Sequence, residues 1–413
     1  MDLRYSEEAE LFRLEVREWI SSVFPSDWRG SGDVEASERA SWLAWWRDSL
    51  REVRLLAPGW PEEFGGRGRD LISESILAEE LARAGVPRYP HSTDSSGLVL
   101  LGPTLLHWGT DEQKKQFLQA TIDGEVRWCQ GYSEPEAGSD LFNVKTQARL
   151  VGDEWVVNGQ KVWQSGGLDA NWIFLVARTD PEAERSKGLS FLLLPMDQPG
   201  VDVRGIRSMA DDTELAEVFF TDARTAASNV VGGVGNGSKV AITLLGYERG
   251  AGGVAAALEA RAELDRLVEF ARRTGRASDT AVRRRIAACR ATVHTLHCLA
   301  LRALASGSSG EPPGPESSIT KLVTSEYRHQ VTELALDVAG RGILAPSGAP
   351  GLAVLGPHPA GIDPTSTAVW TYDFLHARPT TIYGGSSEIQ RNTIGEQVLG
   401  LPREPRVKVP RTS

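Results

Sequence analysis

The spacing of apolar residues changes twice along this chain, near Arg127 and near Gly237. Before Arg127 the apolar residues recur three or four positions apart, as Phe12, Val16 and Trp19 do, which is the period of an amphipathic helix. Between the two changes they alternate with polar residues, as in a half-buried strand. After Gly237 the helical period returns. The sequence therefore predicts an α+β protein in three parts: a helical domain at 1–126, a β-domain at 127–234 and a helical domain at 235–413.

Glycine and proline breaks divide these parts into elements. Helices are predicted at 73–85, 111–125, 238–271 and 279–305, with a further helix from 317 and a last one from 387. Strands are predicted at 171–179, 188–196, 201–206 and 215–220. The dipeptides Gly152-Asp153 and Asn158-Gly159 predict hairpin turns. The segment 344–364 has no periodic pattern, and a loop of this length in a compact domain is often functional.

Composition and charge exclude several classes of function. The 413 residues carry a net charge of −10, whereas a nucleic-acid binder presents a basic face. No apolar run approaches membrane-spanning length, and the acidic N-terminus lacks the basic and apolar pattern of a secretory leader. The three cysteines, Cys129, Cys289 and Cys298, have no metal-type spacing. We therefore expect a cytoplasmic protein with no metal site that binds neither nucleic acid nor membrane.

Three separate motifs occur in a fixed order. They are WCQGYSEPEAGSD at 128–140, VVNGQKVWQSGG at 156–167 and TIYGGSSEIQRN at 381–392. In order and spacing they resemble the motifs of the acyl-CoA dehydrogenase family, and the resemblance covers nearly the whole chain. It implies an N-terminal helical domain, a central β-barrel domain and a C-terminal four-helix bundle, with FAD as cofactor. The implied reaction is α,β-dehydrogenation of an acyl thioester, in which a base takes the α-proton and a hydride passes to flavin N5.

The resemblance also implies which residues contact FAD. The first motif would supply backbone and hydroxyl contacts to the isoalloxazine ring, and the second an aromatic wall and a hydroxyl near N5. The third would contribute to the thioester site and to the adenosine diphosphate end of the cofactor. Carried over to this chain, these roles fall on Tyr132, Ser133, Gly138, Ser139, Trp163, Ser165, Gly384, Ser386 and Glu388, and less directly on Arg273 and Gly340.

Several of these assignments have a structural alternative. A lone tryptophan or serine most often fills a β-core or a turn, and Glu388 also suits the first turn of the final helix. Arg273 lies in ARRTGRASD, which lacks the phenylalanine of the family's Arg-x-x-Phe-Gly element, so it also fits a solvated basic helix end. Gly340 lies in LDVAGRG, where the family usually has a glutamine and paired glycines. These departures indicate an inter-subunit part of the FAD site that is altered or supplied by a different chain.

The third motif lacks the commonest catalytic carboxylate. It reads Tyr383-Gly384-Gly385 where most of the family has Tyr-Glu-Gly. Isovaleryl and long-chain members place the base on the long helix that opens the C-terminal bundle, and the matching segment LLGYERGAGG gives Glu248 that role. An apolar pocket raises the basicity of such a carboxylate. The N–H of Gly384 and a flavin ribityl hydroxyl would polarise the thioester oxygen. Alternatively, Glu248 forms an ion pair, with Arg249 or another cation, that only holds the helix.

The sequence leaves three functions open. The first is an acyl-CoA dehydrogenase that passes electrons to an electron-transfer flavoprotein or a similar acceptor. The second is a non-catalytic subunit that completes the FAD site of another chain. The third is a flavin desaturase or oxygenase acting on a carrier-protein-bound acyl thioester. Glu248 favours the first, since a scaffold does not need a carboxylate there. The family precedent implies a homodimer, homotetramer or heterotetramer built on the C-terminal bundle.

Overall fold

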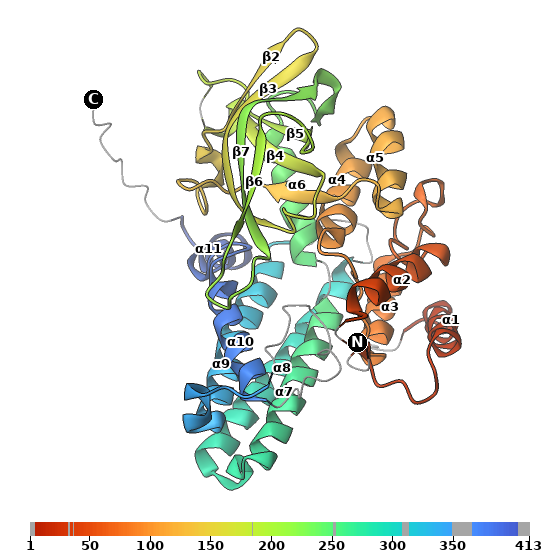
Figure 1. Ribbon diagram of the computed structural model, residues 1–413, viewed down its shortest axis with the longest axis vertical. Helices are drawn as coiled ribbons and strands as arrows, with labels where there is room; N and C mark the ends of the chain where they lie inside the picture. Colours follow the sequence, from red (N-terminus) through yellow and green to blue (C-terminus); the bar gives the residue numbers. More distant parts are fainter. Residues whose placement is uncertain are drawn as a thin grey trace, which may run out of the picture.

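The computed structural model has three parts (Figure 1). It describes residues 5–31, 34–35, 37–183, 185–250, 253–307, 314–348 and 366–403, and the side chains of 248–250, 253–255 and 306–307 lie outside the description. The β-sheet lies at one end, a bundle of long helices extends to the other, and the N-terminal helices flank their junction. The predicted α+β class is confirmed. Within the described residues, no helix is both long and apolar enough to cross a membrane.

Side-chain caps fix where the N-terminal helices begin. Ser6 accepts a hydrogen bond from the backbone N–H of Ala9, and Thr110 forms a capping box with Gln113. The helix predicted at 73–85 begins two residues earlier because Asp70 is its cap. The helices are α1 (Glu7–Val23), α2 (Arg39–Glu52), α3 (Leu71–Arg83), α4 (Gly102–Trp108) and α5 (Asp111–Asp123), with a π-helical turn at Ser95–Leu101.

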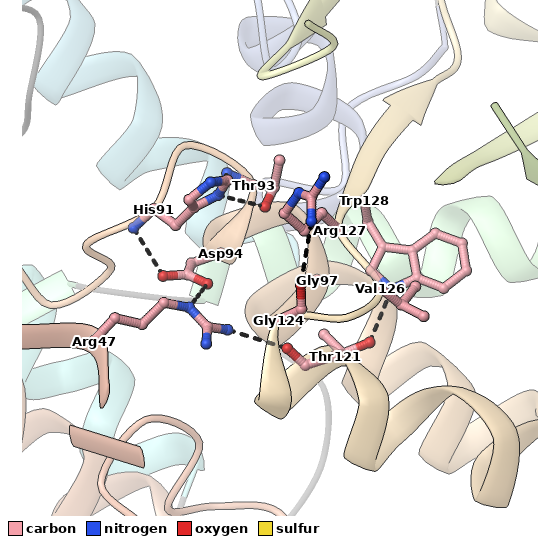
Figure 2. A pocket seen from close by; sticks show the side chains of 10 residues that line it. All are labelled: Arg47, His91, Thr93, Asp94, Gly97, Thr121, Gly124, Val126, Arg127 and Trp128. Atoms are coloured by element: carbon pink, nitrogen blue, oxygen red, sulfur yellow. Dashed lines mark hydrogen bonds and ion pairs between the residues drawn. The ribbon is translucent and has the colours of Figure 1, made fainter. Parts of the chain in front are cut away.

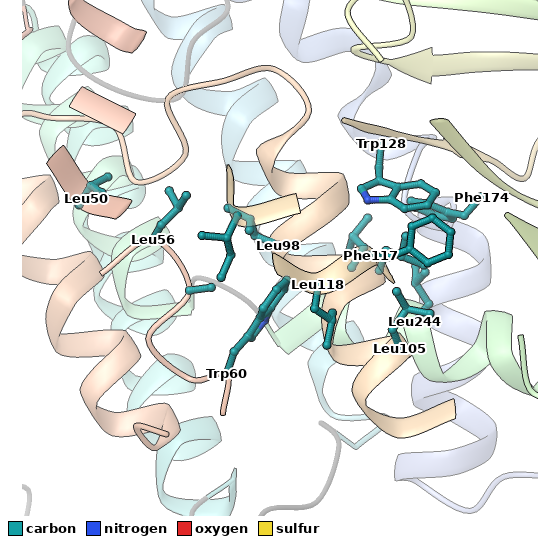
Figure 3. Close-up of a cluster of buried hydrophobic side chains, with 14 of the residues drawn as sticks. Leu50, Leu56, Trp60, Leu98, Leu105, Phe117, Leu118, Trp128, Phe174 and Leu244 are labelled. Carbon is teal, nitrogen blue, oxygen red and sulfur yellow. The ribbon is translucent and has the colours of Figure 1, made fainter. Parts of the chain in front are cut away.

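The N-terminal helices and the sheet share one hydrophobic core, part of which is drawn in Figure 3. Trp60, Phe117 and Trp128 come from three separate segments and belong to this one cluster. The rings of Phe117 and Trp128 lie 5.4 Å apart. A Cβ on Gly102 would lie 1.8 Å from Cζ2 of Trp60, so only glycine fits there. The shared core thus holds the start of the first motif against the N-terminal helices.

Eight strands form one mixed sheet among the described residues. They are β1 (Trp128–Gly131), β2 (Gln147–Val151), β3 (Glu154–Ser165), β4 (Trp172–Arg178), β5 (Leu189–Pro195), β6 (Val201–Ile206), β7 (Leu215–Ala226) and β8 (Val230–Val231). The hydrogen-bonded order is β6-β7-β3-β2-β4-β5-β8, with β1 parallel to β4. All four predicted strands are present, and β7 continues beyond its predicted end.

One of the two predicted hairpin turns is wrong. Gly152-Asp153 does join β2 to β3, but Asn158-Gly159 lies inside β3, where the pairing with β7 shifts register. Gly159 has a φ of +148°, and a Cβ on it would lie 2.5 Å from Oγ1 of Thr146. The glycine therefore marks a bulge and a close backbone approach rather than a chain reversal.

The C-terminal part contains six helices among the described residues. They are α6 (Gly237–Gly250), α7 (Gly253–Arg273), α8 (Thr280–Gly307), α9 (Ser317–Ala339), α10 (Thr367–Ala377) and α11 (Ser387–Thr393). The helix predicted at 238–271 falls on α6 and α7, and its residues 251–252 lie outside the described residues.

Helices α7 to α10 enclose a second core, which includes Leu267, Tyr327 and Trp370. Helix α10 was not predicted, since its sequence TAVWTYDFLHA has little contrast between an apolar and a polar face. Residues 349–364 of the loop predicted at 344–364 lie outside the described residues. The sheet and the bundle are joined directly, because α6 packs against β5 and β4 before α7 leaves toward the bundle.

Candidate active site

Lys161 joins the first motif to the second. Its side chain is fully buried, and Nζ donates to Oε1 of Glu134 at 2.8 Å and to the backbone oxygens of Tyr132 at 3.1 Å and Val176 at 2.8 Å. Burial lowers the pKa of Lys161 to about 8. Burial also acts to raise the pKa of Glu134, but the attraction of Lys161 outweighs it and holds that pKa low. The loop after β1 is therefore anchored to β3.

Trp163 is held in an unusual conformation in the second motif. Its φ is +71°, and the pairing of β3 with β7 shifts register between Val162 and Gln164. The side chain is 58% exposed, whereas Trp155 on the same strand is buried in the sheet core. A left-handed backbone is strained for an aromatic residue and marks functional sites. The alternative that these tryptophans fill the β-core holds for Trp155 and not for Trp163.

The first two motifs carry three serine hydroxyl groups. Ser133 is half-buried, and Ser139 and Ser165 are exposed. None of the three makes a side-chain hydrogen bond with the described part of the chain. A Cβ on Gly138 would meet no atom within 4 Å, so the first-motif loop borders open space. The ring of Tyr132, by contrast, is buried and packs edge-on against Phe174 and Phe191.

A short series of contacts leads from the second motif toward the third. The N–H of Gly166 donates to the carbonyl of Glu214 at 3.1 Å, and Oε2 of Glu214 lies 3.4 Å from Nε2 of His376 on α10. The hydroxyl of Tyr372, also on α10, donates to Asp212 at 3.0 Å. Helix α10 leads through a 3₁₀ turn at Arg378–Thr381 into the third motif. The loop before β7 thus sets the position of this motif relative to the sheet.

The third motif is a tight turn with both glycines in the left-handed region, at φ +63° for Gly384 and +89° for Gly385. Its carbonyls are occupied: Gln390 donates to Gly384 O at 2.8 Å, and Lys321 donates to Gly385 O at 2.7 Å. No described residue accepts a hydrogen bond from the N–H of Gly384. Tyr383 is 57% exposed. The turn is therefore fixed through its oxygens and leaves an N–H group free.

The beginning of α11 uses two of the predicted cofactor residues for its own structure. Ser386 is the N-cap and accepts from the N–H of Ile389 at 3.4 Å. Glu388 lies in the first turn, where a backbone N–H and the Ser386 hydroxyl lower its pKa. Both side chains keep polar atoms at the surface. The structural alternative for Glu388 is thus realised, and a contact with a cofactor remains a prediction.

The predicted base lies on α6. Glu248 is the third residue from the C-terminal end of α6 as described, and its side chain lies outside the described residues. Its neighbour Tyr247 is half-buried, and burial raises the pKa of that phenol.

Arg273 and Gly340 lie away from the other predicted cofactor residues. Arg273 ends α7, a helix of 21 residues, which at a rise of 1.5 Å per residue is about 30 Å long. Figure 1 shows α7 running away from the sheet. Helix α8 returns antiparallel, so α9 runs in the direction of α7 and ends, before Gly340, at the same far end. One chain therefore does not bring these two residues to Trp163.

A polar hollow that no motif predicted lies beside the first two motifs, and Figure 2 shows its lining. It has a volume of about 260 Å³. Nε of Arg47 donates to Asp94 at 2.9 Å, and Nδ1 of His91 lies 2.8 Å from the Thr93 hydroxyl. A Cβ on Gly166 would lie 3.1 Å from Ser92 O, so this segment touches the second motif. No sequence signal marked it, because its residues come from four segments.

The residues around Trp163 fit a flavin. A flavin needs a flat apolar or aromatic wall and hydrogen-bond partners along its polar edge. The exposed indole of Trp163 supplies the first, and the free hydroxyls of Ser133 and Ser165 can supply the second. The N–H of Gly384 adds a donor on the side of the third motif. These residue types therefore suit a planar heterocycle with a polar edge.

Known proteins resemble this chain over nearly its whole length. Family profiles match at 6–125 (acyl-CoA dehydrogenase, N-terminal domain), 129–223 (middle domain) and 235–399 (C-terminal domain). Acyl-CoA dehydrogenase IpdE1 of Mycolicibacterium smegmatis is 40% identical over 411 residues, covering 96% of this chain and 99% of that protein. Among solved structures, the Tcur3481-Tcur3483 steroid ACAD has a TM-score of 0.78 at 28% identity, covering 98% of this chain and 100% of that one. The ChsE4-ChsE5 complex from Mycobacterium tuberculosis has a TM-score of 0.76 at 27% identity, with the same coverage.

Proposed function

Since the chain belongs to the acyl-CoA dehydrogenase family, we propose that its three motifs form the flavin and thioester site of an FAD-dependent enzyme. Membership makes the chain an oxidoreductase that dehydrogenates an acyl-CoA thioester. The strained and exposed Trp163 is the observation that carries the assignment of the site. Exposure of a large apolar indole to water is unfavourable. The exposure and the backbone strain are both explained when a ligand covers the indole.

The proposed flavin contacts are assigned residue by residue. Trp163 provides the wall of the ring, and Ser133 and Ser165 bind polar atoms of its edge. The backbone of Tyr132 and the open loop at Gly138 and Ser139 complete that side. Ser386 and Glu388 are proposed for the adenosine diphosphate end. Bound FAD would supply the acceptor for the β-hydride.

The proposed base is Glu248. Its carboxylate would take the α-proton, which general-base catalysis speeds by about 10²- to 10⁴-fold. The free N–H of Gly384 would donate to the thioester oxygen, whose negative charge grows as that proton leaves. The absence of a side chain at Gly384 leaves room for a carboxylate arriving from α6.

We further propose that a second chain completes the flavin site. Arg273 and Gly340 lie about a helix length from Trp163, so in this chain they would serve the flavin of a neighbouring subunit. The names of two structural relatives, Tcur3481-Tcur3483 and the ChsE4-ChsE5 complex, describe pairs of different chains. An even-numbered assembly, as a homodimer, homotetramer or heterotetramer, follows from this division. Electron-transfer flavoprotein or a similar protein is the proposed acceptor.

A bulky acyl group is the proposed substrate. One structural relative is named a steroid ACAD. A non-catalytic role in a two-chain assembly is the second candidate, favoured by the remote position of Arg273 and Gly340. A carrier-bound acyl thioester would use the same residues as acyl-CoA.

The test is a visible spectrum of the purified chain, alone and after co-expression with its companion subunit, followed by anaerobic titration with a panel of acyl-CoAs. We expect flavin absorption bands that bleach with one class of acyl-CoA. Flavin that never bleaches with acyl-CoA but bleaches with an acyl-carrier protein would move the substrate to the carrier. Flavin that remains when Glu248 is replaced, with unchanged bleaching, would favour the non-catalytic role.

A further inference from the structure

Two side chains from different helices bind the carbonyl oxygens of the third motif. Nζ of Lys321, on α9, donates to the carbonyl of Thr380 at 3.0 Å and to that of Gly385 at 2.7 Å. Nε2 of Gln390, on α11, donates to the carbonyl of Gly384 at 2.8 Å and to that of Gly385 at 3.2 Å. The Gly385 oxygen is therefore bound by both side chains, and the turn is held at three successive carbonyl positions.

The N–H of Gly384 depends on these contacts for its direction. No described residue accepts a hydrogen bond from it, so no protein acceptor holds the N–H itself. Two adjacent glycines adopt more backbone conformations than any other pair of residues. A donor that stabilises developing negative charge is effective only when it is fixed before the reaction begins. The carbonyl contacts of this turn therefore decide whether its free N–H can act as such a donor.

Gln390 makes its contacts with the turn through one end of its amide only. The side chain is 1% exposed, and Oε1 is buried with no partner among the described residues. A buried acceptor left open is destabilising, and an apolar side chain of the same size would not have one. A Cβ on Gly385 would lie 2.5 Å from Nε2 of Gln390, so only glycine allows this close approach. The presence of an amide here is explained by what its donor does to the turn.

Lys321 brings a positive charge to the same turn. Its side chain is partly buried, and its ammonium group lies against the oxygen of Gly385, one residue beyond the free N–H of Gly384. A charge at short range in a partly buried place acts more strongly than it does in water. Negative charge on a thioester oxygen bound to that N–H would therefore also be attracted by Lys321.

We propose that Lys321 and Gln390 are positioning residues for proton removal: they hold the glycine turn so that the N–H of Gly384 points at the thioester oxygen. This inference rests on the proposed function, in which that N–H polarises the thioester. Neither side chain needs to touch the substrate. Because the oxygen carries more negative charge in the transition state than in the bound substrate, the two residues should affect the rate more than the binding of acyl-CoA.

The test measures single-turnover flavin reduction under anaerobic conditions on the assembled, flavin-loaded enzyme. Butanoyl-CoA, dodecanoyl-CoA and 3-cyclohexylpropanoyl-CoA are tried on wild type, and the one that reduces its flavin fastest is used for all variants. The variants are Gln390→Met, Lys321→Met and Lys321→Arg. The control is Arg391→Met, because exposed Arg391 also joins α11 to α9, through Glu326, and makes none of the contacts with the turn carbonyls.

We expect the two methionine variants to lower the limiting rate of flavin reduction by about 10- to 100-fold, as a small misplacement of a reacting group does. The acyl-CoA concentration that gives half of the limiting rate should change by less than about 3-fold. Lys321→Arg should keep most of the rate, since a guanidinium can also donate to two carbonyls. Gln390→Met should keep its flavin and its urea midpoint, because the buried unpaired acceptor is removed together with the donor. Arg391→Met should reduce its flavin at the wild-type rate.

Three results would overturn the proposal. They are an unchanged limiting rate in both methionine variants, a loss of flavin or of stability that accounts for the slower reduction, and an equal loss of rate in Arg391→Met. If Lys321→Met does not fold, Gln390→Met still decides the matter. Wild-type flavin that none of the three acyl-CoAs reduces would count against the proposed function itself. Wild-type flavin that is reduced, with equal rates in the variants, would refute only the positioning role.

Discussion

The ammonium group of Lys161 lies 2.8 Å from Oε1 of Glu134, and both side chains are buried between the loop of the first motif and the strand of the second. Glu134 also accepts hydrogen bonds from the backbone N–H groups of Lys145 and Thr146. Both members of the pair are therefore also hydrogen-bonded to the backbone. It connects the loop that carries Ser133 to the strand that carries Trp163. The proposed flavin edge and flavin wall therefore cannot move independently.

Replacing Lys161 with methionine tests this support. The variant would leave the Glu134 carboxylate buried without its cation, which costs about 3–5 kcal/mol. We expect the midpoint of urea unfolding to fall and the purified protein to lose its flavin absorption. The control is Lys145→Met, which breaks an exposed pair with Glu136 and should change stability by less than about 1 kcal/mol. Adding Glu134→Gln to Lys161→Met should restore part of the loss, and no recovery would argue against the pair as the cause.

The variant Trp163→Gly separates the backbone strain at this position from the proposed role of the indole in flavin binding. Glycine adopts the left-handed backbone without penalty, whereas a tryptophan there costs about 1–2 kcal/mol. We expect the flavin-free variant to be as stable as wild type or about 1 kcal/mol more stable, and to retain less flavin. Trp155→Ala, which removes a buried ring from the same strand, should instead cost about 3–5 kcal/mol. Equal destabilisation by the two changes would show that the Trp163 indole supports the fold.

Glu248→Gln tests the proposed base. The amide has the same shape but cannot take the α-proton, so flavin should remain bound while its reduction by acyl-CoA slows by about 10²- to 10⁴-fold. Stopped-flow absorbance under anaerobic conditions measures this rate. Asp265→Asn, on the neighbouring helix and remote from the motifs, provides the comparison. Reduction at the wild-type rate in the Glu248 variant would remove Glu248 from the mechanism.

His91 makes the free energy of unfolding depend on pH, and the sign of this dependence can be predicted. Burial lowers its pKa below the ordinary 6.5, against the attraction of Asp94 and Asp169 and together with the repulsion of Arg47 and Arg127. The unfolded chain therefore binds the proton first as the pH falls. The free energy of unfolding should decrease below about pH 6.5, with a slope of at most about 1.4 kcal/mol per pH unit from this group.

Urea unfolding of His91→Gln across a series of pH values checks this expectation. As the pH falls, the free energy of unfolding of the variant should decrease less than that of wild type. The difference is the contribution of His91. His107→Gln, at an exposed position, should follow the wild-type curve. A His91 variant that is as acid-sensitive as wild type would mean that His91 is protonated equally in the folded and unfolded chains.

Much of the fold followed from local patterns. The change of period near Arg127 separated helices from strands, and the three motifs gave the family, because spacing and motif order are properties of consecutive residues. Local patterns failed where neighbours in space decide the conformation. Asn158-Gly159 has the sequence of a hairpin turn, but Thr146 and β7 pack against it and keep it in a strand.

The candidate site divides in the same way. The sequence by itself named Trp163, Ser133, Ser165 and Gly384, but it could not show which of several tryptophans is exposed. Only the tertiary structure separated Arg273 and Gly340 from Trp163, and only it paired Lys161 with Glu134. The reason is physical: burial, pairing and pKa depend on the atoms that packing brings together, and for these groups those atoms belong to segments far apart in the chain.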